Sequence, residues 1–402
     1  MSLDPAYLEY PKRRHGYDHD LYPWSALHER PPVKWPQGSV AVWVCVRLEW
    51  FPIVPGGAFA APGHMQTAYP DYRHYTARDY GNRVGAWRFL DALAKVGAKA
   101  SFATNAAVAE RYPELVRAVL DGGHELIAHS TDMNGTIDSS LAANAERDLI
   151  NDAMHRIKLA SGVRPSGWLS IARSQSFNTL NLLKDAGLTY CCDWVNDELP
   201  YRFNNGLIDL PLNHELSDRT IIAVQQQSAD SWAQSLEDAF DWLAAEAVAT
   251  GSGRMLPIHV TPYIMGLPYR IAAFERLLER LAQRSECWFA RGDQIVSSWE
   301  AQQRATAPNS PGPCPPCSAT KAGGTAGIAT SMVRGRWSMP TASRPGVIFP
   351  TRASGMTSST TGWNGTMAAR RPMSSAGGWK AITWSGRPTA SAAMAGRPTK
   401  MC

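Results

Sequence analysis

Several predicted strands carry, at their ends or directly after them, polar or aromatic side chains of types that can do chemistry. The first strand is the apolar run 39–46, and Arg47-Leu48-Glu49-Trp50 stands directly after it. A Glu and His side chains gathered at one edge of a sheet can carry out hydrolysis by general acid–base catalysis. A lone His or Asp at a strand end more commonly binds its own loop, so the set as a whole indicates a site. Its members are Glu49, His129, Trp168, Asp193, Asp197 and His259.

Strand-like and helix-like patterns alternate over residues 39–300. Apolar runs predict strands at 39–46, 100–103, 125–129, 167–170, 190–194, 208–210, 221–224, 255–259 and 287–290. Helical periods predict helices at 83–95, 112–120, 140–160, 178–186, 231–250, 270–283 and a last one to about 299. The alternation predicts one α/β domain, a barrel of parallel strands with its active site at their carboxyl ends. Residues 1–38 are predicted to form an irregular arm.

Composition limits the class of protein. The apolar fraction of 44% is sufficient for a core and excludes a wholly disordered or fibrous chain. No apolar run is long enough for a membrane span, and the first 20 residues lack the apolar stretch of a secretory signal. Seven Cys without a dense framework indicate reduced thiols, so we expect a cytoplasmic protein with no membrane partner.

The last quarter of the chain has a different composition. Residues 301–402 contain twelve Lys and Arg but no Asp or Glu, whereas residues 1–300 contain 28 basic and 35 acidic residues. The basic pI therefore comes from this tail and does not predict nucleic-acid binding by the whole chain. Its richness in Ala, Gly, Pro, Ser and Thr predicts disorder. We weigh a basic nucleic-acid-binding arm, a plain extension and out-of-frame translation of a GC-rich message, and favour the last.

Six motifs carry a resemblance to a known family: Tyr80–Gly85, Gly123–Ser130, Arg164–Trp168, Asp193–Tyr201, Leu210–Asp218 and Met265–Arg270. On these stretches the chain resembles the polysaccharide deacetylase superfamily, the NodB-homology fold of carbohydrate esterase family 4. Within it, the chain is most similar to the allantoinase-type branch, which is thought to work without a metal. The resemblance covers about residues 40–299 and implies a distorted (β/α) barrel.

The metal site of the family is altered in this sequence. Metal-dependent members bind a divalent ion with a carboxylate at the first strand end and two His spaced H-x-x-x-H. Here Trp50 takes the place of the carboxylate ligand, His129 keeps the first His place, and Met133 replaces the second His. Zinc requires three or four N, O or S donors. We therefore expect no cofactor, with zinc as the alternative.

The resemblance also implies roles for individual residues. Glu49 is predicted to be the general base, with its pKa raised by burial beside Trp50 and Leu48. His259 would protonate the leaving nitrogen, and His129, Ser130 or backbone N–H groups would hold the oxyanion. The alternative for Glu49 is a structural ion pair with Arg47 or Arg164.

Further side chains are predicted to contact substrate. Arg164, which we count with Glu49 and His259 among the catalytic residues, is expected to orient a carboxylate at the rim of the site. Arg173 is expected to bind a polar or anionic substituent. A flat ring would lie on Trp50, Trp168 and Trp194, for which the alternative is ordinary core packing. Asp193 and Asp197 would contact substrate or else bind loop amides.

These residues favour a hydrolase acting on a carbon–nitrogen bond other than a peptide bond. The substrate would be a small molecule, a cyclic ureide or imide, opened as an allantoinase does. An N-deacetylase of an acetylated sugar is the alternative, and a catalytically inactive barrel that binds a small ligand is the second. Relatives of this type tend to be oligomeric, so a homo-oligomer is also an expectation.

Overall fold

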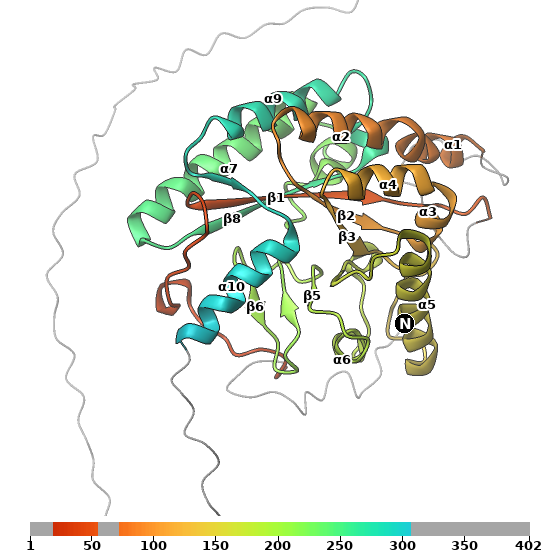
Figure 1. Ribbon diagram of the computed structural model, residues 1–402, viewed down its shortest axis with the longest axis horizontal. Coiled ribbons are helices and arrows are strands. Elements are labelled where there is room, and N and C mark those ends of the chain that lie inside the picture. The colour runs from red at the N-terminus through yellow and green to blue at the C-terminus, as the bar shows by residue number, and fades with distance from the viewer. Residues whose placement is uncertain (1–18, 55–71, 307–402) are drawn as a thin grey trace, which may run out of the picture. The chain divides into compact units, whose positions relative to one another are not determined.

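The computed structural model describes residues 19–54 and 72–306, and Figure 1 shows their arrangement. These residues belong to one compact unit, Met1–Cys317. The predictions made for residues 1–18 and for the tail from 307 onward lie outside the described residues. In the described ranges, no helix is long and apolar enough to cross a membrane.

A nine-stranded mixed sheet forms the centre of this unit. Its strands follow the order β6-β7-β5-β4-β3-β2-β1-β8, and β9 pairs with β1. All of the pairings are parallel except that of β6 with β7. The strands are β1 (Val40–Leu48), β2 (Ser101–Thr104), β3 (Glu125–Ala128), β4 (Gly167–Trp168), β5 (Tyr190–Cys191), β6 (Tyr201–Arg202), β7 (Ile208–Asp209), β8 (Arg254–Val260) and β9 (Cys287–Phe289).

Helices cover the sheet, as Figure 1 shows. Five helices pack against one another in the order α7, α9, α2, α4 and α5. The mixed sheet that they cover is a half-barrel of the predicted α/β type. The helices are α1 (Tyr72–Tyr80), α2 (Ala86–Lys95), α3 (Ala106–Arg111), α4 (Pro113–Asp121), α5 (Ala143–Ser161), α6 (Thr179–Asp185), α7 (Ala229–Thr250), α8 (Pro262–Met265), α9 (Ile271–Ala282) and α10 (Gly292–Thr306).

Strand β1 lies inside the fold and is buried along all nine of its residues. Its side chains alternate between two apolar clusters, because successive residues of a strand point to opposite faces. Val40, Val42, Val44, Val46 and Leu48 pack in one cluster, and Ala41, Trp43 and Cys45 pack in the other. Burial on both faces explains why residues 40–46 of this strand are an unbroken apolar run rather than an alternating one.

One predicted strand is wrong. Residues 221–224 form part of a π-helical segment, η5 (Arg219–Val224), in which the adjacent side chains of Ile221 and Ile222 are both buried. A strand would have pointed these two neighbours to opposite faces. The pattern also missed the short helix α3 and the antiparallel strand β6. A short apolar run does not distinguish buried helix from buried strand.

The sheet brings the predicted catalytic segments to one edge. Leu48 pairs with Thr104 of β2, which in turn pairs with Ala128 of β3. Glu49 and His129 each follow these strand ends directly. On the other side of β1, Cys45 pairs with His259 of β8. The parallel register therefore places a carboxylate and two imidazoles at the carboxyl edge of neighbouring strands.

Candidate active site

Glu49 is a buried carboxylate surrounded by donors. Its Oε2 lies 3.0 Å from Nη2 of Arg219 and accepts a hydrogen bond of 2.8 Å from the hydroxyl of Tyr263. Its Oε1 lies 3.3 Å from Nη1 of Arg47. Arg219 also donates to the Tyr263 hydroxyl, so these groups form one connected network. The backbone carbonyl of Glu49 accepts from the Asn82 side chain at 2.9 Å, which holds the strand end in place.

The pKa of Glu49 shifts in the direction opposite to the sequence prediction. Burial alone would raise the pKa of this carboxyl group, as expected for a tuned general base. The cations of Arg219 and Arg47 outweigh burial and, with His129, hold the pKa of Glu49 well below its ordinary value. The expectation of a raised pKa is therefore wrong, and Glu49 is an anion at neutral pH.

His129 lies beside this anion. Its Nδ1 is 2.7 Å from the carbonyl oxygen of Leu169, and its Nε2 is 3.8 Å from Oε1 of Glu49. The ring is buried, and among the described residues Nε2 has no hydrogen-bond partner. The side chain of Asn105 donates to the His129 carbonyl and anchors its backbone. An unpaired buried nitrogen is uncommon and indicates a functional position.

His259 presents a second such nitrogen. Its Nδ1 lies 3.2 Å from Nη2 of Arg173, and its buried Nε2 has no partner within the described ranges. Burial, reinforced by Arg47 and Arg173, holds the pKa of His259 well below its ordinary 6.5. The ring is therefore neutral at physiological pH, and His259 has no second proton to give to a leaving group.

Asp218, which directly precedes η5, contacts Thr261, which directly follows β8. Asp218 accepts from the backbone N–H of Thr261 at 2.7 Å and from its hydroxyl at 3.1 Å. The same hydroxyl accepts from Nη2 of Arg47 at 2.6 Å. Burial raises the pKa of Asp218 to about 6 despite these contacts and the nearby arginines. This network positions Arg47 against Glu49.

The residues at the family's metal positions do not fit a divalent ion. Trp50 packs its ring against Tyr75 and Tyr112, and it offers no donor atom suited to a metal. Met133 is buried in a small apolar cluster with Phe51 and Ile171. No group of three His, Cys, Asp or Glu side chains in the described part of the chain is arranged to hold a metal ion. We derive no catalytic step through a metal.

Two residues that were predicted to contact substrate form hydrogen bonds with other parts of the protein. The hydroxyl of Ser130 donates to the carbonyl of Gly135 at 2.7 Å, so this hydrogen is not available to an oxyanion. Trp168 is fully buried in the core, where its indole N–H donates to Ser170 at 2.9 Å. Its ring therefore fills the core and is not the floor of a pocket, because no part of it reaches the surface.

Arg164 lies away from the position that the sequence predicted for it. It precedes β4, at the amino edge of the sheet, whereas Glu49 stands at the carboxyl edge. Its exposed side chain donates to the carbonyl of Ala186 at 2.5 Å. The expectation that Arg164 is a catalytic residue that orients a carboxylate at the rim of the site is thus wrong.

Arg173 reaches the site and also lines a groove beside it. The groove has a volume of about 490 Å³, and its walls are Tyr22, Arg173, Gln175, Asp193, Trp194, Val195 and Asn196. The Gln175 amide links Asp193, at 2.6 Å, to the indole N–H of Trp194, at 3.1 Å. Trp194 is half-buried, and its contact with a flat ligand stays a prediction.

The two predicted Asp residues both bind loop groups. Asp193 accepts from the backbone N–H of Ser170 at 2.7 Å and from its hydroxyl at 2.8 Å. Asp197 pairs with Arg30 at 2.6 Å and accepts from the backbone N–H groups of Glu198 and Leu199. These contacts correspond to the structural alternative, although Asp193 also lines the groove.

Sequence reasoning missed Arg219 and Tyr263. Arg219 follows the motif Leu210–Asp218 by a single residue, and Tyr263 follows His259 by four in α8. Their proximity to recognised motifs is a signal that could have drawn attention to them. Their contact with Glu49 could not be read from sequence, because it depends on the π-helical path of η5.

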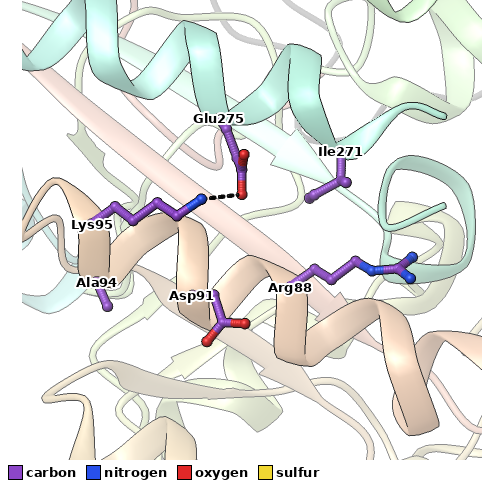
Figure 2. Close-up of a pocket in the computed structure, with 6 residues that line it drawn as sticks. All are labelled: Arg88, Asp91, Ala94, Lys95, Ile271 and Glu275. Carbon is purple, nitrogen blue, oxygen red and sulfur yellow. Dashed lines mark hydrogen bonds and ion pairs between the residues drawn. The ribbon is translucent and has the colours of Figure 1, made fainter. Parts of the chain in front are cut away.

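A second groove lies between α2 and α9 and is shown in Figure 2. Its volume is about 480 Å³, and a Lys95–Glu275 ion pair of 2.7 Å crosses it. Figure 2 shows side chains from two helices that carry none of the catalytic candidates. We therefore place the candidate active site at the strand ends and not in this groove.

A family model and a curated protein match this chain. Residues 74–191 match the model of the family described as polysaccharide deacetylase. The chain is 26% identical over 245 residues to the "Putative polysaccharide deacetylase" of Schizosaccharomyces pombe, covering 56% of this chain and 75% of that protein.

Solved structures are also similar. PuuE allantoinase shares 26% identity with a TM-score of 0.61, over 68% of this chain and 95% of that one. A "probable Polysaccharide deacetylase" from Pseudomonas aeruginosa PAO1 shares 24% identity with a TM-score of 0.62 over the same fractions, which shows the common fold. The predicted resemblance and fold class are confirmed.

Proposed function

Since the chain resembles the polysaccharide deacetylase superfamily, whose members are generally hydrolytic enzymes, we propose that it hydrolyses a carbon–nitrogen bond other than a peptide bond. The observation that carries the proposal is the cluster of Glu49 with the two imidazoles of His129 and His259. Each ring has a buried Nε2 atom with no hydrogen-bond partner among the described residues. A carboxylate and two imidazoles are sufficient for general acid–base hydrolysis.

We further propose that the substrate is a small cyclic ureide or imide, opened in the manner of an allantoinase. Arg47 and Arg173 each have a buried Nε with no hydrogen-bond partner among the described residues. Such donors suit a molecule rich in carbonyl oxygens. The likeness to PuuE allantoinase, at 26% identity, supports the same substrate class.

The second candidate is an N-deacetylase of an acetylated sugar. It is favoured by the family match over residues 74–191, since that family takes its name from this reaction. The misfit of Trp50 and Met133 to a metal site weighs against it. A barrel that only binds a small ligand is the remaining alternative, and the retention of Glu49 with both imidazoles weighs against that one.

A substrate panel separates these functions. Purified protein, with and without prior treatment by a strong chelator, would be offered allantoin, hydantoin, succinimide and an N-acetylglucosamine oligomer. We expect ring opening of at least one cyclic compound, at equal rates with and without the chelator. Deacetylation of the oligomer that the chelator abolishes would overturn the proposal in favour of the second candidate. Binding of a cyclic compound without turnover would favour the binding barrel.

A further inference from the structure

We propose that His129 and His259 are held in opposite neutral tautomers, so that Nε2 of His129 accepts a proton from water while Nε2–H of His259 donates to the substrate carbonyl. The inference rests on the proposed function for its catalytic meaning. It moves the general base from Glu49 to His129. It also makes Arg173 a positioning residue that acts through His259.

The tautomer of His129 follows from its partner. Nδ1 lies 2.7 Å from the carbonyl oxygen of Leu169. A carbonyl oxygen only accepts hydrogen bonds, so Nδ1 must carry the proton. In the neutral ring Nε2 then carries the lone pair, and this atom is the one with no partner in the described residues. His129 therefore offers an acceptor to whatever enters the site.

The tautomer of His259 is the reverse. Its Nδ1 lies 3.2 Å from Nη2 of Arg173. A guanidinium only donates hydrogen bonds, so Nδ1 must carry the lone pair. The proton of the neutral ring therefore resides on Nε2, which is buried and has no partner within the described ranges. His259 offers a hydrogen-bond donor where His129 offers an acceptor.

Glu49 is poorly placed to be the base itself. Its Oε2 accepts from Tyr263 and Arg219, and its Oε1 lies 3.3 Å from both Arg47 and Arg219. Donors thus occupy both oxygens. Its fixed negative charge, 3.8 Å from Nε2 of His129, would instead stabilise the imidazolium that forms when His129 takes a proton.

The resulting hydrolysis balances without any further reactant. Nε2 of His129 removes a proton from water as the water oxygen bonds to the carbonyl carbon, and the carbonyl electron pair moves to its oxygen. That oxyanion accepts a hydrogen bond from Nε2–H of His259. When the electron pair returns, the C–N bond breaks and His129 passes its proton to the leaving nitrogen. One water molecule is consumed, and both imidazoles regain their starting tautomers.

The loop that carries Arg173 shows the strain typical of a positioned group. Ala172 and Arg173 have φ angles of 54° and 56°, in the left-handed region that residues other than Gly rarely adopt. Such conformations cost free energy and persist where surrounding contacts hold them, commonly at functional sites. Here Arg173 donates to the Leu212 carbonyl at 2.9 Å while it reaches His259. The strained backbone positions the guanidinium of Arg173 so that it contacts both the Leu212 carbonyl and His259.

The tautomers can be measured directly without substrate. Two-bond ¹H–¹⁵N correlation spectra of protein labelled with [¹⁵N]histidine distinguish protonated from unprotonated ring nitrogens. Spectra of His129→Gln and His259→Gln assign the two rings among the ten His of the chain, and His129→Asn and His259→Asn serve if either fails to fold. We expect protonated Nδ1 in His129 and protonated Nε2 in His259. The same tautomer in both rings, or the reverse assignment, would overturn the inference.

The positioning role of Arg173 has its own test. Arg173→Met should leave His259 as a mixture of tautomers and lower kcat at least about tenfold, whereas Arg173→Lys, which still donates, should keep the Nε2–H form. Arg117→Met is the matched control, because Arg117 is exposed and pairs with Glu114 on α4. An unchanged His259 spectrum in Arg173→Met would refute this role.

Failure of the inference and failure of the proposed function give different results. If no compound of the panel is hydrolysed but the spectra show the expected tautomers, the proposed function fails and the assignment stands. If ring opening occurs but His129→Gln keeps more than a tenth of wild-type kcat, His129 is not the base. We expect His129→Gln to lose roughly 10²–10⁴ in kcat, with His155→Gln, an exposed position on α5, unchanged.

Discussion

Arg219 and Glu49, which lie 170 positions apart in the chain, form an ion pair of 3.0 Å between a half-buried guanidinium and a buried carboxylate. The contact joins the π-helical segment η5 to the end of β1. Arg219 reaches the hydroxyl of Tyr263 as well, so three elements meet at one carboxylate. This arrangement keeps Glu49 ionised, and Oε1 of the carboxylate lies 3.8 Å from Nε2 of His129.

Neutralising this carboxylate is expected to affect both activity and stability. Glu49→Gln leaves Arg47 and Arg219 without their anion, and removing one partner of a buried pair costs about 3 kcal/mol. We expect a fall in unfolding free energy of that order, measured by urea denaturation, with a loss of at least about 100-fold in kcat.

Glu114→Gln is the control for this change. Glu114 pairs with Arg117 on the exposed face of α4, where such pairs contribute less than about 1 kcal/mol. Full activity in Glu49→Gln would show that the charge of Glu49 has no part in catalysis.

The hydroxyl of Tyr263 supplies a hydrogen bond to a charged group. Tyr263→Phe removes that donor while keeping the ring, and a hydrogen bond to a charged group contributes about 1.5–3 kcal/mol. We expect a stability loss within this range and a decrease in kcat/KM of roughly tenfold.

Tyr201→Phe is the matched control, since its hydroxyl binds only Asn196 in the described residues, at 3.0 Å near the surface. Equal effects of the two substitutions on kcat/KM would argue against a specific contribution of Tyr263 to the site.

The half-barrel was predictable from sequence because it depends on local patterns. Residues 40–46 of β1 are all apolar since both faces of that strand are buried, and Pro113 begins α4 as a proline at the first helical turn does. The segment 221–224 was not predictable in this way. Its buried Ile side chains satisfy a strand pattern as well as the π-helix that the structure adopts.

The candidate site was predictable only in part. Glu49, His129 and His259 follow from strand ends and the register of parallel strands. The contact of Arg219 with Glu49 could not be predicted in this way, because the sequence does not indicate which distant cation reaches a given carboxylate. The raised pKa expected for Glu49 followed from counting burial alone. The two cations that reverse its direction come from the same strand end and from a distant segment.

Glu125 links pH to stability at the opposite edge of the sheet. Burial, and then Asp293, raise the pKa of Glu125 to about 7, although Ser101 and Tyr190 donate to it. The folded state therefore binds a proton that the unfolded chain releases near pH 4.5. This contribution to stability is complete below about pH 4.5 and is lost as the pH rises through about 7.

Glu125→Gln tests this contribution because glutamine does not titrate. We expect the unfolding free energy of the variant to fall less between pH 5 and pH 8 than that of the wild type. Urea denaturation at both pH values would measure the difference between the two slopes. Parallel slopes would show that Glu125 has an ordinary pKa in the folded state.

His259 should give a pH dependence of the opposite sign. Its pKa is held well below 6.5 by burial, then by Arg47 and Arg173, so the unfolded chain binds a proton that the folded state refuses. Stability from this residue is complete above about pH 6.5 and is lost as the pH falls toward the folded-state pKa. The unfolding free energy of the wild type should therefore fall as the pH is lowered from 7.5 to 5.

His259→Gln removes this proton uptake while keeping a side chain of similar size. The unfolding free energy of the wild type should therefore fall more between pH 7.5 and pH 5 than that of the variant. Glu49 and the other acids are shared by both proteins, so their titration cancels in this comparison. His155→Gln, an exposed His on α5, should keep the wild-type slope. If His259→Gln keeps it too, the folded-state pKa of His259 is ordinary and its ring is open to protonation.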